Sequence, residues 1–331
     1  MANQLTGLHH LTAITSSSPR IFHFMSGILG LHLIKKTVNQ DDVRTYHLYF
    51  TDDMGTAGTD ITFFDFPGIQ KAQHGNNEIA RTSFRVPSDA ALTYWIDRFD
   101  TYRVHHDAID ELFGAKILRF HDFDGQQYQL ISDEHNHGVP AGTPWRHSTV
   151  DPQFSIGGLG PEYITTDHYD ELVGVMTDLL GFKQIAKEGQ YTLLELNDGG
   201  HGAQVIIDYQ RLIPAAYQGF GGVHHLAFRT DDRDSLQHWI EKIGAAGLNS
   251  SGFVDRFYFA SEYFRPIPDI LFEIATDGPG FLLDETYEEA GVHLELPPFL
   301  EDQREAIERN LVPFNTEPQT AGRHSYLVRV F

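Results

Sequence analysis

The sequence predicts an α+β fold of four βαβββ modules, arranged as two domains with mixed, curved sheets. Three observations support this prediction. Helix-like segments recur four times along the 331 residues, and a strand-like segment precedes each of them. A Leu-His-His-Leu step at residues 8–11 returns as Val-His-His-Leu at residues 223–226, at the same place in the first and fourth modules. Repeats of this kind indicate a chain built from copies of one supersecondary unit.

The helix of each module is predicted from a stripe of apolar residues. In the first module, Ser18 and Pro19 are the expected N-cap and first helical residue, followed by Phe22, Met25 and Leu29 on one face. Ser88 precedes the second helix. The other three stripes have i, i+3, i+4, i+7 spacing and comprise Leu92, Trp95, Ile96 and Phe99; Leu172, Val175, Met176 and Leu179; and Leu236, Trp239, Ile240 and Ile243.

The strands after each helix are predicted from runs of β-branched and aromatic residues. Gly30 and Gly181 follow the first and third helices, where glycine is typical of a helix C-terminus before a returning strand. The predicted strands are residues 45–51 and 60–66 in module one, 117–120 and 127–132 in module two, 191–196 and 203–209 in module three, and 256–260 and 270–275 in module four.

The predicted domains are residues 1–140, with modules one and two, and residues 153–285, with modules three and four. Residues 135–152 are rich in Pro, Gly and His and form the expected linker. Residues 286–331 form a C-terminal extension, with a helix expected at Glu301–Leu311 and a strand-like end at Tyr326–Phe331.

The composition favours a small-molecule partner. A formal charge of −22 and a pI near 5.1 disfavour binding to nucleic acid or to anionic membranes. The sequence has neither an apolar run long enough to span a membrane nor a signal-peptide pattern, so we expect a cytoplasmic protein. The absence of cysteine excludes disulfides and Cys-ligated metals, so any metal must be held by His, Asp or Glu. The oligomeric state stays open, a homo-oligomer included.

The two His-His steps predict a metal site shared by modules one and four. If equivalent strands of these modules meet, His10 and His225 become ligands of one ion, and Glu273 on the last predicted strand supplies a carboxylate. Two histidines and one carboxylate form the facial triad that leaves positions on Fe(II) open for substrate and oxygen. Sharing one ion requires modules one and four to be adjacent, which leaves modules two and three as the second pair. The fold is therefore expected to surround a metal site.

Neighbouring histidines of a regular strand point to opposite faces, so one of each pair is expected to bind the metal and the other to serve elsewhere. Chance pairing is the alternative explanation in a chain with 19 histidines, and His105-His106 on a predicted loop is an example of it. The register of the two steps within the repeat favours the metal site.

The other modules indicate that the ligand set has three members. When the modules are aligned by sequence, Gln129 of module two is equivalent to Glu273. The equivalent position is near Phe63 or Phe64 in module one and near Ile207 or Asp208 in module three. A glyoxalase-type isomerase would need a further carboxylate, which the apolar Phe63-Phe64 region does not supply. Three ligands leave room for oxygen.

Arg256, Tyr263 and Thr12 are further candidates. An arginine can stabilise developing negative charge near a metal-bound phenolate, and a tyrosine hydroxyl can position or protonate an oxygen intermediate. The alternative interpretation is an exposed arginine, a packed tyrosine and an ordinary strand threonine.

From about Gly7 to Leu311 the chain resembles the vicinal oxygen chelate superfamily, and within it the hydroquinone-type ring-cleaving dioxygenases. The motifs that carry the resemblance are Gly-Leu-His9-His10-Leu-Thr12, Gly-Gly-Val-His224-His225-Leu, residues 255–259, 263–265 and 271–281, and Leu-Pro-Pro-Phe-Leu-Glu at residues 296–301. The resemblance implies the vicinal oxygen chelate fold. It also implies Fe(II), with Mn(II) or another divalent metal as alternatives, on the three ligands, and it implies roles beside them for His9, Thr12, His224, Arg256 and Tyr263.

The resemblance further implies ring opening of a hydroquinone-type aromatic substrate by O2 beside a hydroxyl that binds the metal. Three alternatives stay open at this point. They are extradiol cleavage of catechols, a glyoxalase-like isomerase or lyase, and a binder of small molecules without catalysis.

Overall fold

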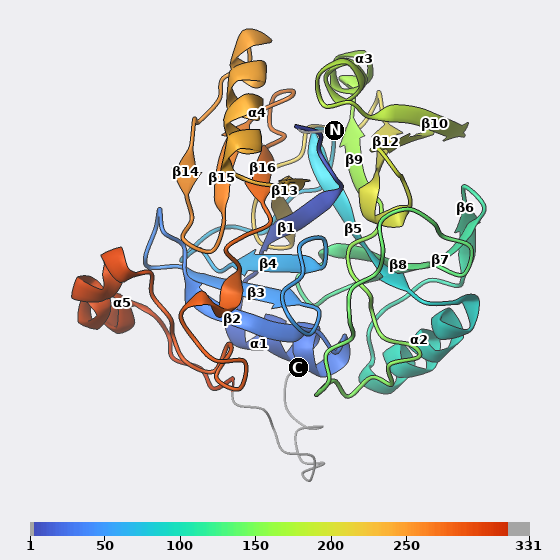
Figure 1. Ribbon diagram of the computed structural model, residues 1–331. Coiled ribbons are helices and arrows are strands. Elements are labelled where there is room, and N and C mark those ends of the chain that lie inside the picture. The colour runs from blue at the N-terminus through green and yellow to red at the C-terminus, as the bar shows by residue number, and fades with distance from the viewer. Residues whose placement is uncertain (1–2, 317–331) are drawn as a thin grey trace.

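Two mixed sheets of eight strands each form the molecule in the computed structural model, which describes residues 3–316 (Figure 1). The first sheet has the order β14 (Val254–Asp255), β15 (Ala260–Phe264), β16 (Phe272–Thr276), β13 (Gly222–Thr230), β1 (Leu8–Ile14), β4 (Asp60–Phe64), β3 (Tyr46–Thr51) and β2 (His32–Val38). The second has the order β10 (Lys183–Glu188), β11 (Tyr191–Glu195), β12 (Gln204–Tyr209), β9 (Glu162–Thr166), β5 (Glu78–Val86), β8 (Gln127–Ser132), β7 (Ala115–His121) and β6 (Asp110–Leu112).

Each sheet joins one module from each half of the chain. Strand β1 pairs antiparallel with β13, and β5 pairs antiparallel with β9. The expected neighbours, modules one with four and two with three, are therefore confirmed, as is the α+β class. The two sheets cut across the predicted domains, and the boundaries at 1–140, 153–285 and 286–331 stay a prediction.

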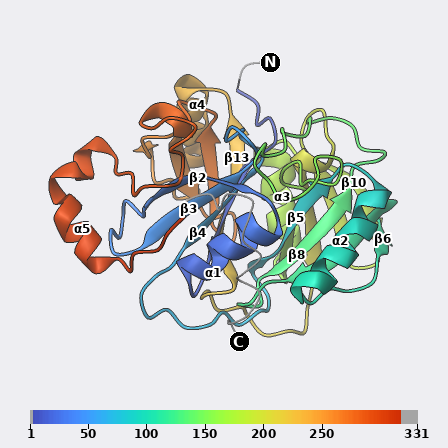
Figure 2. The same cartoon turned by 90° about the horizontal axis from the view of Figure 1, so that it is seen from below.

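Helices cover one face of each sheet (Figure 2). Helix α2 (Asp89–Tyr102) begins after Ser88, whose hydroxyl accepts from Ala91 N as expected of an N-cap, and α4 (Arg233–Ala245) is capped by Asp232. Their stripe residues Trp95 and Trp239 are buried in the main core. In the first and third modules the helices α1 (Ser18–Phe22) and α3 (Tyr169–Gly174) continue as π-helical turns, η1 (His23–Ile28) and η2 (Val175–Leu179).

Two local predictions need correction. The N-cap of α1 is Ser17, so Ser18 and Pro19 both lie inside the first turn, where a proline needs no N–H partner. Residues 256–259 of the predicted strand at 256–260 form a loop between β14 and β15 instead, and only Ala260 lies in a strand, as the first residue of β15. Phe257 adopts a left-handed conformation with φ 68°, and its N–H bonds to the Asp255 carboxylate. That turn ends the extended run and carries Arg256 and Phe259 into the site described below.

The C-terminal extension crosses the edge of the first sheet at β2. It contains the short helices η5 (Pro298–Gln303) and α5 (Arg304–Asn310), so the helix predicted at Glu301–Leu311 is split between a 3-10 turn and an α-helix; the 3-10 turn η4 (Phe281–Leu283) lies just before the extension. A further 3-10 turn, η3 (His201–Ala203), precedes β12. The predicted strand-like end at Tyr326–Phe331 lies outside the described residues. None of the helices between residues 3 and 316 combines the length and apolarity needed to cross a membrane.

Alternation along the strands separates two environments on the first sheet. Leu11, Phe63 and Phe228 point into the main hydrophobic core beneath the helices. The residues between them point to the opposite face, where imidazole, hydroxyl and carboxylate groups gather. That second face holds the candidate site.

Candidate metal centre

A β-bulge in each central strand positions the two His-His steps. Where β1 pairs with β13, Leu8 lies opposite Phe228 but His10 lies opposite Ala227, so His9 is an extra residue. His224 is the extra residue of β13, between Thr12 opposite His225 and Ala13 opposite Val223. A bulge disturbs strict alternation. The sequence analysis expected His9 and His10 to point to opposite faces of the strand. Because of the bulge they do not, and Nδ1 of His9 lies 2.8 Å from Nδ1 of His10.

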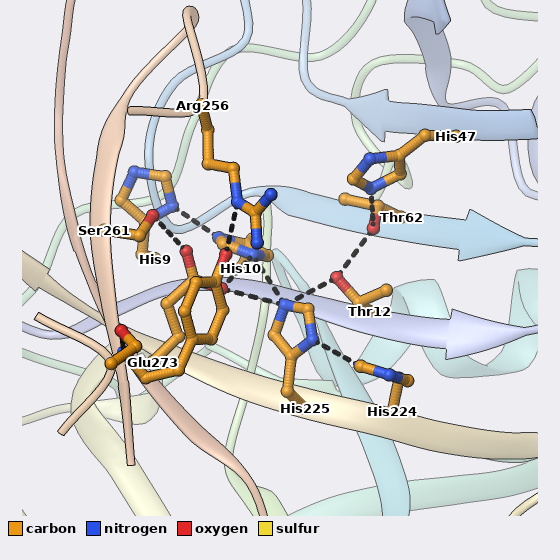
Figure 3. Close-up of polar contacts among 12 residues, drawn as sticks. His9, His10, Thr12, His47, Thr62, His224, His225, Arg256, Ser261 and Glu273 are labelled. Atoms are coloured by element: carbon orange, nitrogen blue, oxygen red, sulfur yellow. Dashed lines mark hydrogen bonds and ion pairs between the residues drawn. The ribbon is translucent and has the colours of Figure 1, made fainter. Parts of the chain in front are cut away.

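The structure brings His10, His225 and Glu273 together (Figure 3). Nε2 of His10 lies 3.1 Å from Nε2 of His225, and Oε2 of Glu273 lies 3.2 Å from the first nitrogen and 2.9 Å from the second. Three bonds of about 2.1 Å at right angles would place donor atoms about 3.0 Å apart, so this spacing suits one ion held on a single face. All three side chains are buried.

The first histidine of each pair sets the tautomer of the second, which is the candidate ligand. If Nε2 of His10 keeps its lone pair, its Nδ1–H donates to Nδ1 of His9, and Nε2–H of His9 donates to the Thr276 carbonyl at 3.1 Å. Burial, and then the charge of His10, lower the pKa of His9 to about 3, so His9 is neutral as this arrangement requires. Nδ1 of His224 contacts Nδ1 of His225 at 2.8 Å in the same way. Both pairs therefore leave an Nε2 lone pair for a metal.

Glu273 is an ionised carboxylate in a buried place. Burial alone would raise its pKa, but the imidazoles of His10 and His225 hold the pKa well below its ordinary range. Burial also opposes protonation of His10, yet the Glu273 charge outweighs it and raises the pKa of His10. The Ser261 hydroxyl on β15 donates to Oε1 of Glu273, which leaves Oε2 for the ion. A divalent cation would replace the shared proton of this cluster.

Arg256 and Tyr263 lie on the same side of the cluster, with Arg256 above Glu273 in Figure 3. Nε of Arg256 donates to the Tyr263 hydroxyl at 3.1 Å, and the Tyr263 ring centroid is 5.8 Å from that of His225. Burial and the charge of Glu273 raise the pKa of Tyr263, so its hydroxyl keeps its proton. Arg256 also bonds to Asp41 at 2.9 Å. The arginine predicted as exposed in the alternative interpretation is thus half-buried beside the cluster.

Thr12 leads to residues that the sequence analysis missed. Its hydroxyl lies 2.9 Å from Nε2 of His225 and 2.8 Å from the Thr62 hydroxyl, and Thr62 contacts Nε2 of His47 at 2.8 Å. Strand pairing makes Thr62 the counterpart of Glu273 in module one, rather than Phe63 or Phe64. The alignment was off because the register of a short apolar run cannot be read from its sequence. A slip of one residue exchanges the two faces of the strand, and Phe63 faces the core.

The same pairing corrects module three and explains why the second sheet lacks the cluster. Gln129 is the counterpart of Glu273 in module two as predicted, but in module three the position belongs to Ile206, not Ile207 or Asp208. Arg81 occupies a histidine position, and Tyr163 bonds to Gln129 at 3.2 Å within a small apolar cluster. Within residues 3–316, His10, His225 and Glu273 are the group of His, Asp and Glu donors with metal-like spacing.

The chain is similar to a known protein family and to curated proteins. A family model described as the Glyoxalase/Bleomycin resistance protein/Dioxygenase superfamily matches residues 158–283. The chain is 39% identical to "Putative ring-cleaving dioxygenase MhqA" of Bacillus subtilis (strain 168) over 315 residues, which cover 94% of this chain and 99% of that protein. It is 29% identical to "Chlorohydroquinone/hydroquinone 1,2-dioxygenase" of Sphingobium indicum, with 94% and 97% covered.

A solved structure also resembles the chain throughout. The crystal structure of a "putative dioxygenase" from Bacillus subtilis subsp. subtilis str. 168 superposes with a TM-score of 0.88 at 33% identity, and the match covers 96% of this chain and 100% of that one.

Proposed function

The chain belongs to the Glyoxalase/Bleomycin resistance protein/Dioxygenase superfamily, and from this premise we propose that it is an Fe(II)-dependent ring-cleaving dioxygenase for hydroquinone-type substrates. The observation that carries the proposal is a ligand set of three, with a threonine in place of a fourth ligand. A glyoxalase-type site would need a carboxylate in module one, where Thr62 lies instead. Three donors leave positions open for a substrate oxygen and for O2.

The residues present fit iron well. Two neutral imidazoles and one carboxylate, each with its other polar atom engaged by His9, His224 or Ser261, match the donor set of non-haem Fe(II) oxygenases. Iron held by His10, His225 and Glu273 would supply a Lewis acid for the ionised hydroxyl of the substrate and a route for electrons from the ring to O2. Mn(II) or another divalent metal is the alternative occupant.

Arg256 and Tyr263 are proposed to act on the oxygen anion that develops during ring opening. The guanidinium supplies a positive charge beside the cluster, and the hydroxyl of Tyr263, held at 3.1 Å from Arg256 Nε, is a donor whose raised pKa keeps its proton available. His9 and His224 keep the ligand imidazoles in one tautomer. The Thr12 hydroxyl lies beside the same cluster, 2.9 Å from Nε2 of His225.

Aromatic side chains at the site suit a planar substrate. The Phe259 ring lies 5.3 Å from the rings of both His9 and His10, and the Phe64 ring lies 5.4 Å from that of His224. Rings at these separations can pack against a substrate ring by edge or face contacts.

The overall reaction incorporates both atoms of O2 into the product. One ring carbon–carbon bond breaks, between the carbon that bears the reacting hydroxyl and its neighbour, and each new end gains one oxygen atom. The first end becomes a carboxylic acid and the second an aldehyde, which makes a hydroxymuconic-type semialdehyde from hydroquinone. No other oxidant or reductant is consumed.

Oxygen uptake by the reconstituted protein tests this proposal. The protein is stripped with a chelator, reloaded with Fe(II) without air, and given hydroquinone or catechol in an oxygen electrode. We expect uptake of one O2 per hydroquinone and formation of a semialdehyde, with no uptake by the Glu273→Gln variant. Preferred uptake with catechol would indicate extradiol cleavage instead. Activity with nickel or zinc and no oxygen consumption would indicate an isomerase, and substrate binding that survives loss of His10 would indicate a binder.

A further inference from the structure

On the module-one side of the cluster, the position equivalent to Glu273 is Thr62, and hydrogen-bonded side chains surround it. The pairing of β1 with β13 and of their neighbours relates module one to module four position by position. The equivalent pairs are His10 with His225, Thr12 with Ala227, Thr62 with Glu273, Tyr49 with Tyr263, and His47 with Ser261. In module four, Ser261 donates to the candidate ligand carboxylate of Glu273. Module one uses the matching positions for a chain of hydrogen bonds.

That chain runs without a gap from Tyr49 to the ligand His225. The Tyr49 hydroxyl lies 2.8 Å from Nδ1 of His47, and Nε2 of His47 lies 2.8 Å from the Thr62 hydroxyl. Thr62 lies 2.8 Å from Thr12, whose hydroxyl lies 2.9 Å from Nε2 of His225. Figure 3 shows His47, Thr62, Thr12 and His225 in this order. Thr12 and Thr62 are fully buried, so water does not supply alternative partners.

One tautomer sets the direction of every bond in the chain. When His224 receives the Nδ1–H of His225, Nε2 of His225 is an acceptor and Thr12 must donate to it. The Thr12 oxygen then accepts from Thr62, and Thr62 accepts from Nε2–H of His47. Nδ1 of His47 is left as an acceptor for Tyr49.

The buried Tyr49 holds this direction. In the reversed chain, Nδ1–H of His47 would donate to the Tyr49 oxygen, and the phenol hydrogen of Tyr49 would lose the partner that it has in the described structure. Tyr49 is 3% exposed, so water offers little replacement. Leaving a buried donor unpaired is unfavourable. Burial also raises the pKa of Tyr49 well above its ordinary value, so the hydroxyl stays a donor.

A metal on His225 takes the lone pair to which Thr12 donates. We propose that Tyr49, His47 and Thr62 are positioning residues that hold the freed Thr12 hydroxyl as a hydrogen-bond donor to the ionised hydroxyl of the aromatic substrate. This inference rests on the proposed function. It makes the corner that would hold a fourth ligand the place where the substrate oxygen is received. We call the hydrogen-bonded series Tyr49, His47, Thr62 and Thr12 the relay. The relay exchanges no proton with the substrate; it fixes the direction in which Thr12 donates.

A Thr62→Val and Thr62→Ser pair tests the proposal, because the two variants differ in the hydroxyl and little in size. The protein is loaded with Mn(II) and titrated with hydroquinone without air, while ultraviolet absorption reports the phenolate. We expect Thr62→Val to weaken hydroquinone binding about tenfold and to raise the pH at which bound hydroquinone ionises, since a charge-assisted hydrogen bond loses its orientation. Thr62→Ser should restore both values. Mn(II) affinity should stay within about threefold of wild type in every variant.

A second readout needs neither metal nor substrate. Nitrogen NMR of the metal-free wild type should find His47 with hydrogen on Nε2 and an acceptor Nδ1, and Tyr49→Phe should disturb Nδ1 and weaken hydroquinone binding in the same direction as Thr62→Val. Thr82→Val is the matched control, because Thr82 is a fully buried threonine of the second sheet whose hydroxyl has no hydrogen-bond partner in the described structure.

The outcomes separate the two proposals. A wild type that neither binds hydroquinone nor consumes O2 with it overturns the proposed function, and this inference with it. A wild type that does both, beside a Thr62→Val variant that binds hydroquinone equally well, overturns the relay alone. A His47 with hydrogen on Nδ1 also overturns the relay.

Discussion

At the scale of single residues, the site depends on how each polar atom beside a ligand is engaged. Ser261 holds one oxygen of Glu273, while His9 and His224 hold the Nδ1 atoms of the ligand imidazoles. The three candidate ligands could be predicted from sequence because the His-His step recurs at the same place in two modules and Glu273 lies on the last predicted strand of the fourth module. Ser261 and His47 could not, because a lone serine or histidine on a strand has no distinctive spacing.

Removal of the Ser261 hydroxyl should weaken metal binding without unfolding the protein. Ser261→Ala leaves Oε1 of Glu273 without its donor, so we expect about a tenfold loss of Fe(II) or Mn(II) affinity by anaerobic titration. Ser250→Ala is the matched control, because Ser250 makes the same kind of contact with Glu262 outside the cluster. Equal metal affinity in Ser261→Ala and wild type would remove Ser261 from the site.

A buried acid of the second sheet should make stability depend on pH. Burial raises the pKa of Glu162 well above its ordinary value, although the Ser83 N–H lowers it in part. The folded protein therefore keeps this proton while the unfolded chain releases it above about pH 4.5, so stability should fall as pH rises beyond that value.

Glu162→Gln should remove that dependence. Denaturant unfolding at about pH 5 and pH 8 should give a free-energy difference between variant and wild type that grows by about 1 kcal/mol or more in favour of the variant at the higher pH. Glu241→Gln on the exposed face of α4 should give no such trend. A constant difference for Glu162→Gln would contradict the buried, protonated acid.

At the scale of elements, the sequence predicted periodic segments and missed interruptions. The stripes of α2 and α4 and the strand at Gln127–Ser132 were predicted correctly because their periodicity is unbroken. The bulges at His9 and His224 leave no mark in the sequence, because a bulge is a relation between two strands. The strand predicted at residues 256–260 was wrong over residues 256–259, because the left-handed Phe257 turns an apolar run into a loop.

A buried lysine joins the segment just before the C-terminal extension to the first sheet. Nζ of Lys35 on β2 contacts Asp284 at 2.7 Å and also pairs with Glu285, while Tyr258 of the site loop donates to Asp284 at 3.0 Å. The point where the extension begins is therefore tied both to the sheet edge and to the loop that carries Arg256.

Lys35→Met should destabilise the protein by roughly 2–3 kcal/mol in denaturant unfolding. Removing one partner of a buried pair typically costs about 3–5 kcal/mol, and the cost should be smaller here because burial raises the pKa of Glu285 to about 7 and lets it take up a proton. We also expect faster proteolysis within residues 284–295. Lys116→Met, which removes a surface ion pair with Asp89, should change neither property. Unchanged stability in Lys35→Met would show that the segment at Asp284 and Glu285 is held by other contacts.

At the scale of the whole molecule, the central strands of both sheets pair across the two halves of the chain. Residues 1–152 contain β1 and β5 but lack β13 and β9, to which those strands pair. The module order and the pairing of module one with module four could be predicted from the repeat, because a shared ion requires them to meet. The spread of each sheet over both halves means that the predicted domain boundaries need a test of their own.

Expression of residues 1–152 and 153–331 as separate chains provides that test. We expect neither chain alone to unfold cooperatively in calorimetry, since each exposes the apolar and hydrogen-bonding surfaces of two unpaired central strands. Co-expression should yield a complex that unfolds in one transition and binds metal. A cooperative transition for residues 1–152 alone would establish that half as an independent domain.

The account as a whole rests on one ion held between the two ends of the chain. The most direct measurement is anomalous diffraction at the iron absorption edge from crystals grown without air in the presence of Fe(II). We predict one peak at about 2.0–2.3 Å from Nε2 of His10, Nε2 of His225 and Oε2 of Glu273. No peak at these three atoms, or an iron bound by other side chains, would contradict the proposed centre and the chemistry built on it.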